Sequence, residues 1–281
     1  MSDQAETLRR LMTDAATAPS PLPERPGEIP APAARGLGVV AFCSATPGGG
    51  RSSLLMNLAR TLGRAGERVL LADPGLGSSP VCRSKGFALH AEEARRVFPC
   101  DGENESQSID SQGLKFLDGV EERLRAVGGT DGLALVDAGS AEDERMPSLI
   151  RSKFLNVMVV NARLTGREAT MKSHHALLKI LREKRGIRRA GVIINQVRSA
   201  AAASEIIREL RTAARRKFGV ELDYLGHWID DQKINQTVNR GEFLVDLYAG
   251  DPSASCVEMI SKRLLDWRNP LTPWSEVRQC Q

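Results

Sequence analysis

The sequence has few cysteines, and they form no pattern. The five cysteines among 281 residues are scattered, with no C-x-x-C pair and no cluster with histidine. This spacing argues against the disulfide framework of a small secreted domain and against a zinc finger. We therefore expect reduced thiols.

Long apolar runs are also missing. The first residues, MSDQAETLRRLM, lack the apolar centre of a signal peptide. No stretch approaches the roughly 20 apolar residues that a helix needs to cross a bilayer. Aromatic residues make up only 4% of the chain, so aliphatic side chains must fill the core. These features predict a cytoplasmic location, with peripheral contact to the inner face of the plasma membrane as the alternative.

Charge is nearly balanced overall but unevenly distributed. The formal net charge is +4, yet the stretch from Arg151 to Lys217 carries 17 Lys and Arg against 4 Asp and Glu. Such a stretch suits an anionic lipid surface, nucleic acid or an acidic partner. Solvation of two helix faces is the simpler explanation and the one we favour, so the stretch makes no strong case for nucleic acid.

Short apolar runs alternate with helical patterns along most of the chain. This alternation predicts an α/β fold with a mostly parallel, twisted sheet covered by helices on both faces. Strands are expected at residues 38–44, 68–73, 114–117, 132–139, 156–162, 190–197 and 222–228. Helices are expected at residues 52–66, 167–184, 204–218, 232–240 and 253–267.

The ends of the chain differ from this body in composition. Residues 1–17 have the spacing of a short helix, and residues 18–36 contain six prolines, which favour an extended linker. The alternating α/β pattern spans residues 37–268. Residues 269–281 form a short tail in which Pro270 and Pro273 interrupt any continuing helix.

A glycine-rich turn between the first strand and the first helix of the body is the strongest local signal. In ATPGGGRSS, three glycines allow backbone N–H groups to approach an anion closely, and the following helix adds its positive end. A complete Walker A motif needs Lys where Arg51 stands, and Gly where Ala45 stands. The residues expected to bind nucleotide phosphates are Gly48, Gly49, Gly50, Arg51, Ser52 and Ser53.

Two aspartates end predicted strands. Asp73 closes RVLLAD and Asp137 closes LALVD. Carboxyl ends of parallel strands meet where α/β proteins bind ligands, and carboxylate and hydroxyl oxygens suit Mg²⁺. We therefore predict Ser52, Asp73 and Asp137 as magnesium ligands, directly or through water. Asp73 and Arg51 are the candidate catalytic residues.

The order of these motifs resembles the MinD/ParA family of deviant Walker A ATPases, and within it the FlhG group, also called FleN or YlxH. Three stretches carry the resemblance: the N-terminal SDQAETLRRLM, the loop and helix in VVAFCSATPGGGRSSLLMNLARTLGRAG, and the C-terminal VIINQVRSA followed by LDYLGHWIDDQKINQTVNRGEFLVDLYAGDPSAS. It covers most of the chain and implies a P-loop fold, ATP or ADP with Mg²⁺ as cofactors, and contact between Asn195 and adenine.

The chain departs from the family pattern at several positions. Arg51 replaces the P-loop Lys, and Thr46 replaces the signature Lys that reaches the partner subunit's nucleotide. Gly75 replaces a second Asp that would orient water. Because cationic and water-orienting groups contribute about 10³-fold or more to phosphoryl transfer, we expect weak or absent hydrolysis and a weakened homodimer.

The N-terminal segment has a separate implied role. In the FlhG group the corresponding segment docks on the GTPase FlhF, of the signal-recognition-particle family, and stimulates it. The matching residues are Asp3, Gln4, Leu8 and Arg9. The resemblance thus implies a regulator of flagellar placement or number, with basal-body or transcriptional partners. An active ATPase that uses Arg51 in place of Lys, and a basic nucleic-acid-binding scaffold, remain the alternatives.

Overall fold

The computed structural model describes residues 37–73, 117–120, 122, 132–163, 167–240 and 242–268. All of them belong to one compact unit of the chain, Ala34–Gln281. The predictions for residues 1–17, for the whole linker at residues 18–36 and for the 269–281 tail lie outside the described residues, as does Gly75. The proposed domain boundaries therefore stay predictions.

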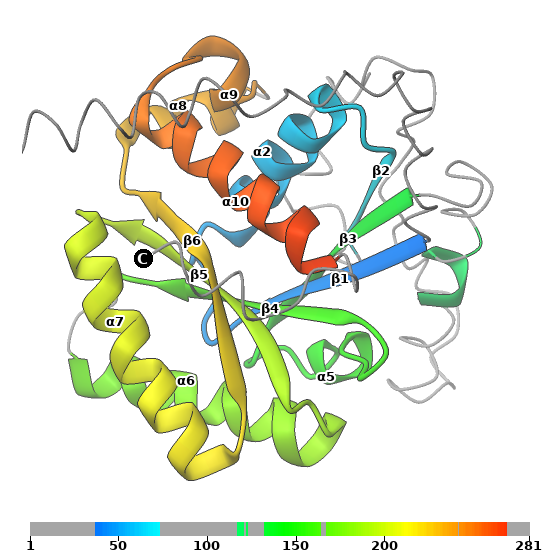
Figure 1. Ribbon diagram of the computed structural model, residues 1–281, viewed down its shortest axis with the longest axis vertical. Coiled ribbons are helices and arrows are strands. Elements are labelled where there is room, and N and C mark those ends of the chain that lie inside the picture. The colour runs from blue at the N-terminus through cyan, green and yellow to red at the C-terminus, as the bar shows by residue number, and fades with distance from the viewer. Residues whose placement is uncertain are drawn as a thin grey trace, which may run out of the picture. The chain divides into compact units, whose positions relative to one another are not determined.

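The centre of the fold is a six-stranded sheet with the order β2-β3-β1-β4-β5-β6. Every neighbouring pair is parallel, which confirms the predicted parallel sheet. The strands are β1 (Leu37–Ser44), β2 (Val69–Ala72), β3 (Gly132–Ser140), β4 (Leu155–Asn161), β5 (Arg189–Val197) and β6 (Glu221–Ile229). They cross the middle of Figure 1 as blue to yellow arrows.

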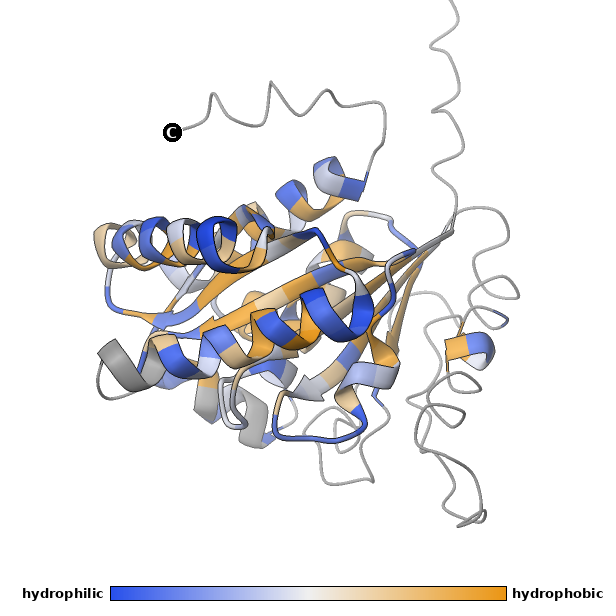
Figure 2. Ribbon diagram, turned by 90° about the horizontal axis from the view of Figure 1, so that it is seen from below, coloured by the Kyte–Doolittle hydropathy of each residue, from blue (hydrophilic) through white to orange (hydrophobic). Residues whose placement is uncertain are grey.

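Helices cover both faces of this sheet. Figure 2, which looks from below, shows the apolar strands between helices whose outer surfaces are hydrophilic. On one face lie α2 (Arg51–Arg64), α8 (Gln232–Arg240), α9 (Leu244–Leu247) and α10 (Pro252–Arg268). On the other lie α5 (Met146–Leu149), α6 (Arg167–Lys179) with the π-helical turn η1 (Ile180–Lys184), and α7 (Ala200–Ala213) with the π-helical turn η2 (Ala214–Phe218).

Alternation along β1 divides the core in two. Val39, Ala41 and Cys43 face one set of helices, while Val40 and Phe42 face the other. Successive side chains of a strand point to opposite faces, so a strand buried on both faces reads as a continuous apolar run. The sequence GVVAFCS has this property, and that is why it predicted a central strand.

Two predicted elements differ from the structure. The helix expected from Ser204 begins at Ala200, because the Ser199 side chain caps it by accepting a hydrogen bond from the Ala202 N–H. The alanines at 200–203 have no apolar periodicity, so the pattern missed this first turn. Of the strand expected at 114–117, only Leu117 is described, and it is helical, as are residues 118–120.

β6 forms one edge of the sheet. Among the described strands, β5 is its only neighbour in the sheet, and α7 and α10 flank it in Figure 1. The guanidinium of Arg211, from α7, donates a hydrogen bond of 2.9 Å from Nε to the Leu222 carbonyl. A side chain of a neighbouring helix thus satisfies one backbone carbonyl of this edge strand.

The order of the strands reverses direction around β1. The chain leaves β1 toward β2 and β3 on one side and later fills β4, β5 and β6 on the other. In open α/β sheets, ligands bind outside the carboxyl ends of the strands at this switch point. The glycine-rich loop follows β1 directly, so the fold puts it in the expected position.

Candidate functional site

The loop between β1 and α2 contains two glycines that are required by their backbone conformation. Gly48 has φ +74° and Gly50 has φ +69°, a left-handed region that strains other residues. A Cβ added at Gly50 would lie 2.7 Å from Nδ2 of Asn195. Only glycine therefore fits at position 50, both for its conformation and for its closeness to β5.

Helix α2 begins immediately after this loop and has no side-chain cap at its first residue. Gly50 is the N-cap, and the first intrahelical bond runs from the Leu54 N–H to the Gly50 carbonyl at 3.0 Å. The N–H groups of the first helical turn therefore have no carbonyl partner within the helix. Together with the positive end of the helix dipole, they form a seat suited to an anion such as phosphate.

Arg51 turns away from the loop toward the neighbouring strand. Its Nε donates to Oδ1 of Asp137, and its Nη1 donates to Ser44 Oγ at 2.6 Å. Ser44 in turn donates to the Thr46 carbonyl at 2.8 Å. The guanidinium therefore joins the end of β1, the start of α2 and Asp137 within β3.

Ser52 approaches the same carboxylate from the helix. Its hydroxyl donates to Oδ2 of Asp137 at 2.7 Å. Both oxygens of Asp137 thus accept hydrogen bonds from consecutive residues of α2. The side chain of Asp137 is only 3% exposed and that of Arg51 only 15%, so this ion pair is largely shielded from water.

Asp73 follows the end of β2, next to Asp137. Ala72 pairs with Val136 in the parallel register, which brings the following residues of the two strands side by side. Asp73 is 5% exposed. Arg51 and Ser52 are thus both bonded to Asp137, while the backbone register places Asp73 at the end of the strand beside Asp137. Their roles as ligands or catalytic groups stay predictions.

Asn195 contacts the glycine loop from the other side. Its Nδ2 donates to the Gly49 carbonyl at 2.6 Å, and its Oδ1 accepts from the Gln196 N–H at 2.8 Å. Gln196 has φ +57°, the only left-handed conformation among described residues other than glycine. The predicted adenine contact of Asn195 stays a prediction, since its amide here holds the loop.

Sequence reasoning missed two residues of this site, Ser44 and Gln196. Ser44 ends a strand whose other residues are apolar, which was its only sequence signal. Gln196 carries no signal, because its conformation depends on its neighbours in the fold. The predicted partner-binding residues Asp3, Gln4, Leu8 and Arg9 lie outside the described residues.

The Cys43 thiol lies next to this site but is buried, which makes it unreactive. Cys43 precedes Ser44 on β1 and is fully buried. Burial raises the pKa of the Cys43 thiol to about 12, because a thiolate is poorly solvated inside the core. The neutral thiol therefore acts as a packing group and not as a nucleophile.

The donor set suits magnesium in chemistry but not in its present arrangement. Oxygens from Ser52, Asp73 and Asp137 are ligands that Mg²⁺ accepts. However, Ser52 and Asp137 bond to each other, and Arg51 already supplies a positive charge at Asp137. Within the described part of the chain, no three His, Cys, Asp or Glu side chains converge as a metal site. The residues fit a magnesium ion only if Arg51 moves, so the predicted ligands stay a prediction.

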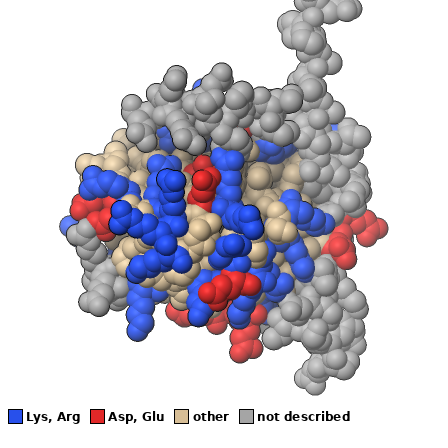
Figure 3. Space-filling view, turned by 60° about the horizontal axis from the view of Figure 1, so that its bottom comes forward, with Lys and Arg blue, Asp and Glu red and all other residues tan. Residues whose placement is uncertain are grey.

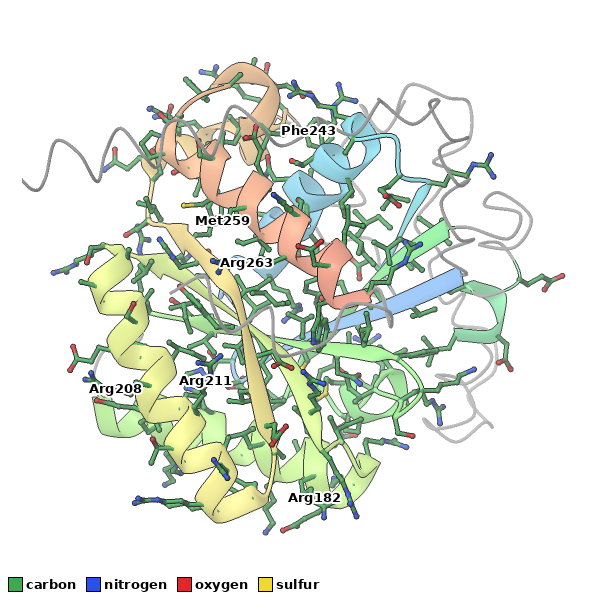
Figure 4. The ribbon with its side chains drawn as sticks, in the orientation of Figure 1. Arg182, Arg208, Arg211, Phe243, Met259 and Arg263 are labelled. Atoms are coloured by element: carbon green, nitrogen blue, oxygen red, sulfur yellow. The ribbon has the colours of Figure 1, made fainter. Side chains whose placement is uncertain are left out.

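The surface below the sheet is rich in positive charge. Figure 3 shows Lys and Arg side chains gathered on this face, with few acidic side chains between them. Arg208 and Arg211 project from α7, Arg182 from η1, and Arg263 from α10 on the other side of β6 (Figure 4). Some charges of this region are paired, as in Arg189 with Asp223 at 2.6 Å.

None of the described helices has the length and apolar character needed to cross a membrane.

Comparison with known proteins agrees with this geometry. The chain belongs to the family of CobQ/CobB/MinD/ParA nucleotide-binding domains, whose profile matches residues 40–245. It is therefore a P-loop protein of the MinD/ParA type, as the resemblance in the sequence implied.

One curated relative is an antiactivator by name. The antiactivator FleN of Pseudomonas aeruginosa is 20% identical over 254 residues, which cover 84% of this chain and 89% of FleN. This similarity agrees with the FlhG/FleN group to which the sequence pattern pointed.

Solved structures share the fold at low identity. The MinC:MinD cell division complex of Aquifex aeolicus has a MinD-like chain at 18% identity and a TM-score of 0.58, covering 81% of this chain and 96% of that chain. The septum site-determining protein MinD of Pyrococcus horikoshii, complexed with Mg-ADP, reaches 13% identity and a TM-score of 0.57 over the same shares. Apo McdA of Cyanothece reaches 15% and 0.54, covering 81% and 99%.

Proposed function

We propose that this chain is a nucleotide-binding regulator of the MinD/ParA type that acts through protein partners and hydrolyses ATP slowly or not at all. The observation that carries the proposal is the phosphate seat between β1 and α2, which is complete in its backbone but changed in its side chains. Membership of a nucleotide-binding family and similarity to an antiactivator both support it.

The backbone of the loop supports binding. The left-handed glycines at 48 and 50 shape the turn, and the first turn of α2 presents N–H groups without intrahelical partners. Phosphate binding of this kind relies on main-chain donors and on the helix dipole, which do not depend on side-chain identity. Binding of ATP or ADP can therefore survive the changes in the loop.

The side chains support slow turnover. The P-loop Lys of the family contacts the phosphates as a compact ammonium, whereas Arg51 is a planar fork committed to Asp137 and Ser44. Thr46 and Gly75 lack the charge and the carboxylate that the family resemblance assigns to these positions. Without these groups, charge that develops during phosphoryl transfer is poorly compensated.

Nucleotide binding is tested by titration with a fluorescent ATP analogue. We expect saturable binding by the wild-type chain and a loss of about tenfold or more in affinity for Gly50→Ala, which distorts the loop. Gly219→Ala is the matched control, because Gly219 also has φ +62° but an added Cβ there meets nothing within 4 Å. Equal affinities for the two variants would argue against the loop as the binding site.

The regulatory role rests on the N-terminal segment and on the similarity to FleN. We propose that Asp3, Gln4, Leu8 and Arg9 dock on an FlhF-type GTPase and stimulate it, in control of flagellar placement or number. A glutamine offered in this way can orient the attacking water at the partner's nucleotide. The proline-rich composition of residues 18–36 favours an extended linker, which supports this proposal.

A stimulated GTPase assay with the full chain tests this role. We expect the wild-type chain to accelerate GTP hydrolysis by the cognate GTPase and Gln4→Ala to lose most of that effect. Gln232→Ala, a change at an exposed glutamine of α8, serves as the control. Stimulation that is unaffected by Gln4→Ala would contradict the proposed role of the segment.

An active ATPase that uses Arg51 in place of Lys is the competing hypothesis. Retention of Ser52, Asp73 and Asp137 is the observation in its favour. Steady ATP turnover by the wild-type chain, lost on Asp73→Ala, would favour this alternative.

A further inference from the structure

The position of Arg51 gives the site a built-in cation. The guanidinium bonds to Oδ1 of Asp137 through Nε and to Ser44 through Nη1, so it bridges the last residue of β1 and Asp137 of β3. Asp137 is the carboxylate that the sequence pattern assigned to a metal ion. A side chain of the same protein therefore already balances its charge.

The other predicted metal ligand is engaged at the same carboxylate. Ser52 Oγ donates its hydrogen to Oδ2 of Asp137 at 2.7 Å. The other oxygen, Oδ1, accepts from the guanidinium of Arg51. Both carboxylate oxygens of Asp137 are therefore hydrogen-bonded. A magnesium ion at Asp137 has to compete with these bonds and with the fixed positive charge of Arg51.

Burial makes that competition costly for the ion. Asp137 is 3% exposed and Arg51 15% exposed at the side chain. Separating a buried pair leaves charge without compensation in a medium of low polarity. Mg²⁺ also gives up its hydration shell reluctantly. The Arg51 guanidinium is therefore a more favourable partner for the Asp137 carboxylate than a hydrated magnesium ion.

Arg51 still has hydrogen-bond donors to offer. A guanidinium carries five N–H groups, and the hydrogen bonds found among the described residues use one on Nε and one on Nη1. The remaining N–H groups lie on the residue that opens α2, directly after the three glycines. The backbone of the same residue thus belongs to the first turn of α2, whose N–H groups form the phosphate seat.

We propose that Arg51 is the resident cation of this site in place of Mg²⁺, so that the chain binds the metal-free form of a nucleoside di- or triphosphate. This inference rests on the proposed nucleotide binding and specifies its ligand. It explains how an intact phosphate loop persists beside a carboxylate that a metal would otherwise neutralise.

The test compares nucleotide affinity in excess MgCl₂ with affinity in EDTA, using calorimetry on the full chain with ADP. For the wild type, we expect the two dissociation constants to agree within about threefold. For Arg51→Lys, whose shorter ammonium frees Asp137, we expect binding to become at least about tenfold tighter with Mg²⁺ than with EDTA. Wild-type binding that is tenfold tighter with magnesium overturns the inference but leaves nucleotide binding intact.

A second variant keeps the test decisive if Arg51→Lys does not fold. Ser52→Ala removes the hydroxyl that would ligate magnesium. With Arg51 as the cation, we expect any change in affinity to be the same in MgCl₂ and in EDTA. A loss confined to MgCl₂ overturns the inference. Absence of ADP binding by the wild type in both buffers overturns the proposed nucleotide function, and the inference with it.

Discussion

Arginine occurs in two contrasting settings in this protein. Arg51 is mostly buried and bonds to an almost fully buried aspartate at the centre of the sheet. Arg208 is exposed and projects from α7, as Figure 4 shows. The contrast shows that the amount of positive charge in a region says little about its importance, because a single paired cation in a dry site outweighs many solvated ones.

Removing the buried cation should produce the largest effect. Arg51→Met leaves the Asp137 carboxylate without its charged partner, and we expect a loss of about 4 kcal/mol in the free energy of unfolding. Arg208→Met should change stability by less than about 0.5 kcal/mol, since both residues are good helix formers and the site is exposed. Urea denaturation followed by circular dichroism measures both. Similar losses of stability in the two variants would show that the buried arginine contributes no more than the exposed one.

Changing the loop that carries Arg51 should have the next largest effect. In Gly50→Ala, the left-handed conformation and the overlap of Cβ with Asn195 act together, and we expect a loss of about 3 kcal/mol. Gly219→Ala keeps the left-handed strain without the overlap, and about 1 kcal/mol is expected. The difference between these two free energies isolates the close approach of the loop to β5. A difference near zero would show that the loop moves away freely.

The hydrogen bond from Asn195 offers a smaller change at the same site. Asn195→Ala leaves the Gly49 carbonyl without its buried donor, and we expect a loss of about 2 kcal/mol. Asn161→Ala is the matched control at the end of β4, where the side chain accepts from the Arg163 N–H in a more exposed setting. About 0.5 kcal/mol is expected there. Thermal unfolding of both variants makes the comparison, and a larger loss for Asn161→Ala would contradict it.

The smallest effect is that of the Arg263 charge on the pKa of His227. Burial, and after it the charge of Arg263, lowers the pKa of His227 below its ordinary value. As the pH falls, His227 therefore binds a proton in the unfolded chain before it does so in the folded one. The free energy of unfolding decreases for this reason below about pH 6.5. Arg263→Met should raise the pKa of His227 toward its ordinary value and reduce this loss of stability.

Titration of the His227 ring by NMR checks that prediction. Arg208→Met provides the control, because Arg208 is not among the causes of the shift. His227 also bonds to the Tyr224 hydroxyl through Nδ1 at 2.8 Å. An unchanged or lowered pKa of His227 in Arg263→Met would show that the charge of Arg263 does not hold that pKa down.

The sequence predicted the frame of the site better than its internal bonding. Three glycines between an apolar run and a helical pattern located the loop, and strand-terminal aspartates located Asp73 and Asp137. Pairing of Arg51 with Asp137 could not be predicted, because it depends on β3 lying next to β1 although 86 residues separate the two side chains. The same holds for Asn195 and Gly49, which come from strand β5 and the loop after β1.

Local patterns failed where periodicity was absent. The start of α7 in four alanines was missed, although Ser199 carried a capping signal. The run ending at Leu117 was expected to be a strand, yet Leu117 is helical. Short apolar runs fit a strand or a buried helix equally well, and only tertiary packing decides between them.

The bond between Arg211 and the Leu222 carbonyl bears on how copies of the protein meet. An edge strand with free carbonyls is a template onto which another chain can add a strand, which leads to open-ended growth. Here one carbonyl of β6 is already satisfied by a charged side chain, and the strand at the opposite edge, β2, has only four residues. Within the described part of the chain, both edges of the sheet therefore offer little free strand backbone to which another chain could add a strand.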